Sequence, residues 1–172
     1  AAIVLADCKL ERTANGLVWG AFTNAGQNCA SIERVYVERP VADKLVARVV
    51  ELTNKLVAGV DTARITTHKQ AAIVRRHLAE AVAMGAEILA GGAPPEGSLD
   101  FPPTVVRITN EDCALLKEET FGPTLTVAKV RDVHEAIERT NATNYGQAGS
   151  VFSGNAKRGM ENALRANPLE IR

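Results

Sequence analysis

The sequence predicts an α/β fold, a layered sheet with helices on its faces. Short apolar segments alternate along the chain with segments of helical periodicity, 46% of the 172 residues are hydrophobic, and no internal repeat, low-complexity tract or long linker interrupts the pattern. Strands that alternate with helices favour a sheet with at least some parallel pairs, because each helix can serve as a crossover connection. We therefore expect one compact domain with a substantial core.

The first segment of the chain predicts one helix and one strand after a short apolar run, Ala2–Ala6. From Leu10 to Phe22, apolar residues recur at intervals of three and four, the spacing of an amphipathic helix, and Asn24-Ala25-Gly26 is a plausible stop. Apolar and polar residues then alternate in ERVYVERP, residues 33–40, which predicts a strand that Pro40 closes.

Two helices and a short strand are predicted next. Helical periodicity extends from Val41 to Val57, and Gly59 is expected to end this helix. A second helix is predicted over Thr67–Met84. The chain then turns into a strand at Glu87–Ala90. The Pro- and Gly-rich residues 91–103 are expected to form a surface loop with a restricted backbone.

The last third of the chain continues the alternation. Asp132, three residues before Glu135, resembles a capping box at the start of a helix. Helices are predicted over 133–140 and 156–166, and strands, the last of them buried, over 104–109, 124–130 and 148–154.

The charge balance bears on the kind of partner. Lys and Arg total 20, Asp and Glu total 20, and neither sign forms a block. A nucleic acid or an anionic membrane surface would favour a basic excess, so we expect a small-molecule partner and neither of those two.

The cysteines and histidines do not predict a metal site or a disulfide framework. Cys8, Cys29 and Cys113 form an odd set without CxxC spacing, and the three histidines lie far from them in sequence. The sequence contains no signal peptide pattern and no apolar run long enough for a transmembrane helix, so we expect a reducing, cytoplasmic location. The chain begins without Met inside ordered-looking sequence and reads as a piece of a longer protein.

Cys29, in the segment TNAGQNCAS at residues 23–31, is either a nucleophile or a small buried residue. A reactive thiolate needs a base, a positive charge or backbone N–H groups, and the sequence neighbours supply only a small-residue loop whose amides could form an oxyanion hole. Most cysteines of reduced proteins are small buried hydrophobes. His68 and His77 are expected on a helix surface and His134 in solvent, so an activating base would be a carboxylate or lie outside the chain.

A second unusual segment is EETFGP, residues 118–123. It presents a carboxylate and an aromatic ring side by side ahead of a predicted strand. It is either a solvated acidic turn with Phe121 in the core, or a ligand site in which a carboxylate accepts hydrogen bonds from hydroxyls while the ring packs on a flat heterocycle.

Together the two segments resemble the catalytic domain of the aldehyde dehydrogenase superfamily. That family carries a GQxC loop with the nucleophilic cysteine and, about ninety residues later, an EExFGP motif; here these are residues 26–29 and 118–123. The resemblance also covers, in family order, IVLADCKLERTANGLVWGAFTNAGQNCAS, GAEILAGG, PPTVV and NYGQAGSVF.

The resemblance implies a role for each matching residue. Cys29 would attack an aldehyde carbonyl, hydride would pass to NAD or NADP, and water would hydrolyse the resulting thioester to a carboxylic acid. The backbone N–H of Cys29 would donate to the oxyanion. Glu119 would hold the ribose hydroxyls on the nicotinamide side, Phe121 would pack near the nicotinamide, and Glu118 would support the turn.

The resemblance also implies that residues 1–172 are a catalytic domain truncated at both ends. The family's general-base glutamate, its cofactor-binding domain, the oxyanion-hole asparagine and the hairpin used for subunit association fall outside the chain, so the fragment is expected to be weak or inactive and its parent a homo-oligomer. Two alternatives stay open: a non-catalytic binding or interaction module on the same fold, and a cysteine-dependent acyl transferase or esterase.

Overall fold

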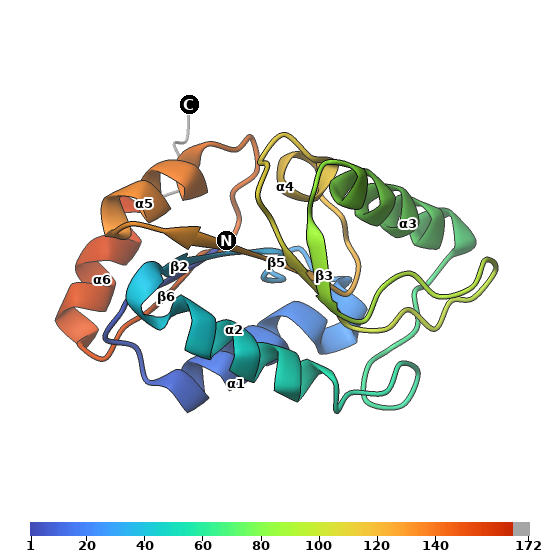
Figure 1. Ribbon diagram of the computed structural model, residues 1–172, viewed down its shortest axis with the longest axis horizontal. Helices are drawn as coiled ribbons and strands as arrows, with labels where there is room; N and C mark the ends of the chain where they lie inside the picture. The colour runs from blue at the N-terminus through green and yellow to red at the C-terminus, as the bar shows by residue number, and fades with distance from the viewer. Residues whose placement is uncertain (167–172) are drawn as a thin grey trace.

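The computed structural model describes residues 1–166, which form a six-stranded sheet with helices on both faces (Figure 1). All neighbouring strands are parallel except β3 and β4, which are antiparallel. The predicted α/β fold with parallel pairs is therefore confirmed. The strands lie in the order β3-β4-β5-β2-β1-β6, and their bounds are β1 (Ala2–Val4), β2 (Arg34–Glu38), β3 (Glu87–Ala90), β4 (Thr104–Arg107), β5 (Thr124–Val130) and β6 (Ser150–Phe152).

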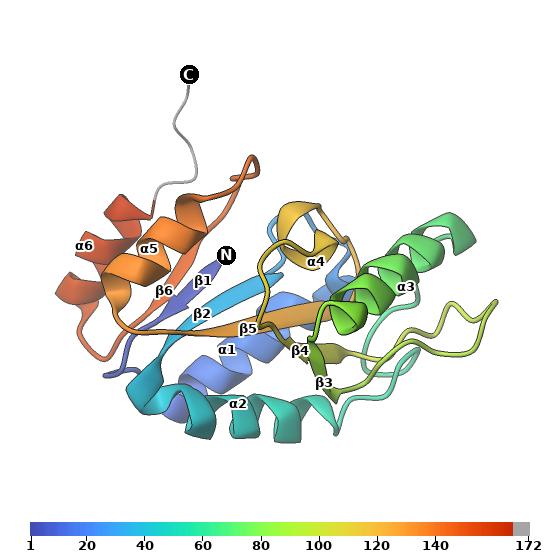
Figure 2. The same cartoon turned by 45° about the horizontal axis from the view of Figure 1, so that its top comes forward.

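The helices divide between the two faces of the sheet. Figure 2 shows two of them below the sheet, namely α1 (Leu10–Phe22) and α2 (Arg39–Thr53). The opposite face carries α3 (His68–Ala83), α4 (Ala114–Lys117), α5 (Val133–Asn141) and α6 (Ala156–Arg165). The four-residue α4 was not predicted from the sequence, because a single turn is too short to show helical periodicity.

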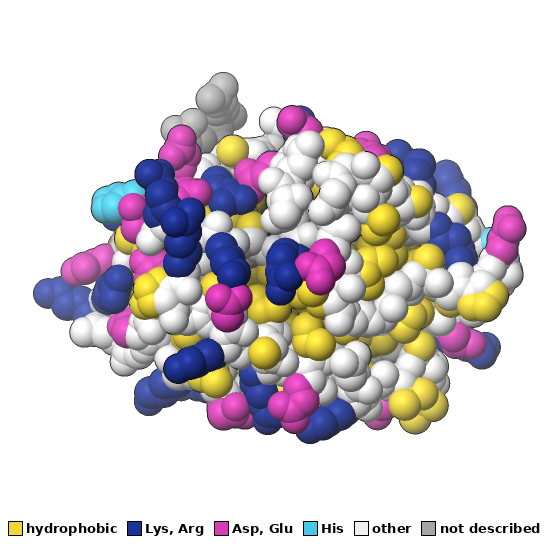
Figure 3. Space-filling model, viewed as in Figure 1, with side chains coloured by type: hydrophobic (Ala, Val, Ile, Leu, Met, Phe, Trp, Pro, Cys, Tyr) yellow, Lys and Arg dark blue, Asp and Glu magenta, His cyan; other side chains and the backbone are white. Residues whose placement is uncertain are grey.

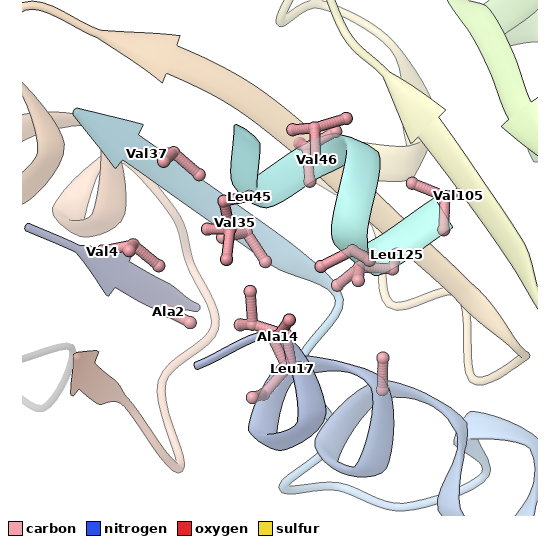
Figure 4. Packing of buried hydrophobic residues seen from close by; sticks show 14 of the residues in the cluster. Ala2, Val4, Ala14, Leu17, Val35, Val37, Leu45, Val46, Val105 and Leu125 are labelled. Carbon is pink, nitrogen blue, oxygen red and sulfur yellow. The ribbon is translucent and has the colours of Figure 1, made fainter. Parts of the chain in front are cut away.

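The core forms because successive strand residues point to opposite faces of the sheet. In β1, Ala2 and Val4 belong to the cluster that packs against α1 and α2, whereas Ile3 belongs to the cluster that packs against α5. Figure 4 shows the first cluster, with side chains from the strands meeting those of the two helices, among them Ala14, Leu17, Val35, Val37, Leu45 and Val46.

Most predicted boundaries lie within about two residues of the observed ones, and the C-terminal end of α2 is the exception. The predicted helix runs to Val57, but α2 ends at Thr53. The apolar period continues beyond Thr53, yet the backbone N–H of Val57 donates to the Asp61 carboxylate (2.8 Å) and a turn replaces the helix. Pro40 lies in the first turn of α2 and does not end the strand, because proline fits a position where the helix needs no N–H donor.

Two further expectations concern the last part of the chain. Asp132 caps α5 by accepting a hydrogen bond from the Glu135 N–H (3.0 Å), as predicted. The strand predicted to be buried, β6, is only half-buried, because it lies at the edge of the described sheet.

The surface agrees with the even charge balance of the sequence. Figure 3 shows basic and acidic side chains interspersed on the face in view. Within residues 1–166, no helix combines the length and the apolar composition that crossing a membrane requires.

Candidate active site

The loop that carries Cys29 begins with an unusual backbone. After α1, the short 3₁₀ helix Thr23–Gly26 contains three consecutive residues with positive φ: Asn24 and Ala25 at 54° and Gly26 at 67°. Non-glycine residues rarely adopt this left-handed conformation, so the surroundings must hold the turn in place. The turn redirects the chain from α1 toward β2 and leaves the Cys29 side chain exposed. Cys29 is therefore not the small buried residue of the alternative interpretation.

Gln27 ties this loop to the segment that precedes α3. Its side-chain amide donates to the backbone oxygens of Asn24 (3.1 Å) and Arg64 (2.9 Å). Its side-chain oxygen accepts hydrogen bonds from the N–H (2.8 Å) and the hydroxyl (2.7 Å) of Thr66. Gln27 thus uses both its donor and its acceptor group, which glutamate or leucine could not do.

The side chain of Asn28 closes a tight turn around Cys29. Its Oδ1 accepts a hydrogen bond from the Ala30 N–H (2.9 Å). Within residues 1–166 the N–H of Cys29 has no hydrogen-bond acceptor, so this donor can serve a bound group.

The second sequence motif lies directly against the first. A β-carbon placed on Gly26 would overlap the carbonyl oxygen of Gly122, so the backbones of the two motifs approach more closely than any side chain would allow. The structure therefore brings residues about ninety positions apart into contact, as the two-motif interpretation requires.

Helix α3 holds the turn of the second motif. Gln70 Nε2 donates to the Thr120 oxygen (2.6 Å), and His77 Nδ1 lies 3.1 Å from Thr120 Oγ1. Glu118 Oε2 accepts a hydrogen bond from Arg76 (3.2 Å) and lies 3.2 Å from His77 Nε2. The hydrogen bond from Arg76 lowers the pKa of Glu118. Glu118 thus contacts two residues of α3, and the supporting role that the resemblance implies for it stays a prediction.

The prediction that His77 lies on the helix surface is wrong. Its side chain is fully buried, because this side of α3 packs against the turn at Glu118–Thr120. Burial, followed by the nearby Arg76 guanidinium, lowers the pKa of His77. His68 and His134 are exposed, as predicted.

A cavity of about 70 Å³ joins the two motifs with a third segment of the chain. Cys29 and Glu119 both line it, and Phe121 is not among its lining residues. The loop before β6, residues 145–149, supplies a further part of the wall. Besides Cys29 and Glu119, the polar and charged residues that line the cavity are Asn28, Ser31, Glu33, Arg34, Glu118, Thr140, Tyr145 and Gln147.

Glu33 is a residue of this cavity that sequence reasoning missed. Its carboxylate accepts hydrogen bonds from the backbone N–H groups of Phe121 (2.8 Å) and Thr120 (3.4 Å). Burial raises the pKa of Glu33, and these two N–H donors oppose that increase. The available signal was an acidic residue four positions after Cys29, but it merged with the strand pattern of residues 33–40.

The described residues offer no site for a metal ion. In the part of the chain that the structure describes, no three His, Cys, Asp or Glu side chains are grouped so that they could hold one.

Comparison with known proteins agrees with this geometry. A model of the family described as "Aldehyde dehydrogenase family" matches residues 1–167. A Mycobacterium ulcerans protein that carries the name succinate-semialdehyde dehydrogenase [NADP(+)] 2 is 35% identical over an alignment of length 173, and the alignment covers 96% of this chain and 33% of that protein. The chain thus spans about a third of the length of such relatives.

Solved structures also match this chain over most of its length and over about a third of theirs. NADP-dependent glyceraldehyde-3-phosphate dehydrogenase from Bacillus halodurans matches with a TM-score of 0.89 and 34% identity, over 95% of this chain and 35% of that one. Lactaldehyde dehydrogenase from Escherichia coli matches with a TM-score of 0.91 and 29% identity, over 96% of this chain and 36% of that one. With its fold, its two adjoining motifs and a family match over nearly its whole length, the chain belongs to the aldehyde dehydrogenase family.

Proposed function

We propose that residues 1–172 are most of the catalytic domain of an NAD(P)-dependent aldehyde dehydrogenase that oxidises an aldehyde to a carboxylic acid. The observation that carries this proposal is that an exposed thiol and a motif carboxylate, Cys29 and Glu119, line the same cavity. The family match over residues 1–167 supports it.

Cys29 acts as the nucleophile. Its thiolate attacks the aldehyde carbon and forms a thiohemiacetal, and the carbonyl oxygen becomes an oxyanion that the Cys29 N–H can stabilise. The rigid turn at residues 24–26 and the hydrogen bonds of Gln27 fix the position of this N–H before substrate arrives. After hydride has left the carbonyl carbon, water attacks the thioester, releases the acid and regenerates the thiol.

The residues present fit a nicotinamide nucleotide. When bound, its ring accepts the hydride that leaves the carbonyl carbon. Glu119 can accept hydrogen bonds from the ribose hydroxyls, because its side chain is exposed at the cavity. Glu118 instead bonds Arg76 and faces His77, which supports the division of roles between the two glutamates. Phe121 follows in the same turn and would pack beside the nicotinamide.

The remaining machinery belongs to parts of the parent protein outside this chain. These parts comprise the general-base glutamate, the cofactor-binding domain, the asparagine of the oxyanion hole and the hairpin for subunit association in a homo-oligomer. Absence of a general base alone removes a factor of roughly 10²–10⁴ in rate, so the chain by itself should be weak or inactive.

The test is a chimera in which residues 1–167 replace the matching segment of the Escherichia coli lactaldehyde dehydrogenase. We expect the chimera to reduce NAD⁺ or NADP⁺ with short aldehydes and semialdehydes, the matched Cys29→Ala chimera to be inactive, and the isolated chain to show little turnover. A chimera that is folded by circular dichroism yet oxidises no aldehyde would refute the proposal. Nucleotide-independent ester hydrolysis that depends on Cys29, with no aldehyde oxidation, would favour the acyl transferase or esterase alternative.

A further inference from the structure

Glu33 connects the two motifs of the site. It follows the Cys29 loop by four residues, and its backbone oxygen accepts hydrogen bonds from the N–H (2.9 Å) and the hydroxyl (2.8 Å) of Thr126 in β5. Its carboxylate meanwhile reaches the turn that precedes β5, where it accepts from the N–H groups of Phe121 and Thr120. One residue thus fixes the start of β2 against β5 and also holds the turn.

This turn contains a residue in an unfavourable backbone conformation. Phe121 has a φ of 51°, in the left-handed region that residues other than Gly, Asn and Asp seldom adopt. Such a conformation persists only where neighbouring groups enforce it. The 2.8 Å hydrogen bond from the Phe121 N–H to the Glu33 carboxylate is a direct constraint of this kind.

We propose that Glu33 is a positioning residue that holds the turn carrying Glu119 and Phe121 in the conformation that binds the nicotinamide nucleotide. That the bound molecule is a nucleotide rests on the proposed function. The clamp, by which we mean the hold of the Glu33 carboxylate on the turn, rests on the two hydrogen bonds. Glu33 acts through the backbone of the turn and not through contact with the reacting atoms.

The chemistry explains why a carboxylate stands at this position. A carboxylate presents two acceptor oxygens to two consecutive N–H donors, whereas the isosteric glutamine presents one acceptor and one donor. In Glu33→Gln, an NH₂ group would face one of the two backbone N–H groups, so at least one hydrogen bond is lost.

Ionisation of the Glu33 carboxyl group opposes folding. Burial, together with the charge of the nearby Glu119, raises the pKa of Glu33, and these effects exceed the opposing effects of the two N–H donors and Arg34. The raised pKa means that the folded protein binds the Glu33 carboxyl proton more tightly than the unfolded chain does. At neutral pH, where this group is ionised, it therefore disfavours folding. A neutral glutamine removes that penalty, and this gain opposes the free-energy cost of the lost hydrogen bond. If Glu33 clamps the turn, Glu33→Gln should therefore loosen the turn without lowering the stability of the whole domain.

The experiment measures amide hydrogen exchange by NMR in the purified protein and in Glu33→Gln, with Glu161→Gln on the exposed surface of α6 as the matched control. We expect the Thr120 or Phe121 amide to exchange at least about tenfold faster in Glu33→Gln, while the midpoint of urea unfolding stays the same or rises. Glu161→Gln should change neither quantity. Unchanged exchange at both amides would overturn the inference, and so would faster exchange of all core amides accompanied by a lower midpoint.

The same substitution in the chimera described above connects the clamp with the nucleotide. We expect the KM for the nucleotide to rise about tenfold while the KM for the aldehyde stays unchanged. Equal changes in both KM values would contradict the positioning role. If the parent chimera oxidises no aldehyde, the proposed function fails, and the exchange measurement still decides whether Glu33 clamps the turn.

Discussion

Gly26 and Gly122 meet backbone to backbone, so that a β-carbon on Gly26 would overlap the Gly122 carbonyl oxygen. Each glycine belongs to one of the two sequence motifs, and their contact places the nucleophile loop beside the turn that carries Glu119. The closeness of the two motifs thus depends on the absence of a side chain at a single position.

Gly26→Ala should therefore be strongly destabilising. It introduces a steric overlap with the Gly122 backbone at a residue whose φ is 67°, and the two effects together should lower the free energy of unfolding by about 2–4 kcal/mol. Urea denaturation measures this change. Gly97→Ala is the matched control, because Gly97 also has a positive φ (84°) but open space around its α-carbon. An equal loss of stability in both variants would show that backbone conformation alone matters.

Gln27→Glu should destabilise the nucleophile loop. The new carboxylate places an acceptor against the backbone oxygens of Asn24 and Arg64, to which Gln27 now donates. We expect a loss of about 1–3 kcal/mol in the free energy of unfolding. Asn28→Asp makes the same chemical change one residue later, but Asn28 uses only its acceptor oxygen within the loop, so its effect should stay within about 0.5 kcal/mol.

Cys29 should be the thiol that reacts first with iodoacetamide at pH 7.5. It is exposed, whereas burial raises the pKa of both Cys8 and Cys113 and thereby lowers their thiolate fractions. Peptide mass spectrometry should show alkylation of Cys29 at least about tenfold faster than that of Cys113. Faster labelling of Cys113 would mean that the buried cluster around it opens readily in solution.

His77 should make stability depend on pH below its ordinary pKa of 6.5. Burial lowers the pKa of His77 in the folded protein, so below pH 6.5 the unfolded chain binds a proton that the folded protein does not. Stability is therefore lost as pH falls from 6.5 toward the lowered value, with a slope of at most about 1.4 kcal/mol per pH unit.

Urea denaturation at several pH values between 7.5 and 5.0 measures this slope. His77→Gln should show a smaller decline over that range, whereas His68→Gln, which changes an exposed side chain, should follow the wild-type curve. Identical slopes for His77→Gln and wild type would assign the pH dependence to other groups.

Sequence reasoning succeeded where local periodicity dominates. The bounds of α1 and β5 match their predictions, because an amphipathic helix and an alternating strand each have a period that the sequence shows. The bounds of β3 also match, although that strand was predicted from the turn that precedes it and shows no alternation. It overestimated α2, where the apolar period continued beyond the last helical residue and the Asp61 carboxylate captured the N–H of Val57. The Asp61 side chain reaches Val57 only because a turn folds the chain back, and hydrophobic periodicity does not reveal such a turn.

The candidate site was predictable only in part. The motif residues Cys29, Glu119 and Phe121 came from family resemblance, and their catalytic and cofactor roles stay predictions that the chimera and its Cys29→Ala control test. The burial of His77 and the participation of Glu33 were missed, because each depends on a partner at least forty residues away in the chain. Such partners become neighbours only when the sheet and α3 are assembled.

The sequence by itself determined the fold class, most of the elements and the family, because hydrophobic period and two spaced motifs are properties of the chain. Tertiary structure decided that Cys29 is exposed, that Gly26 touches Gly122 and that Glu33 and His77 hold the second motif from two directions. The physical reason is that burial, close backbone approach and hydrogen bonding depend on distances in space. Parallel strand pairing brings together residues that lie far apart along the chain, so these distances do not follow from separation in the sequence.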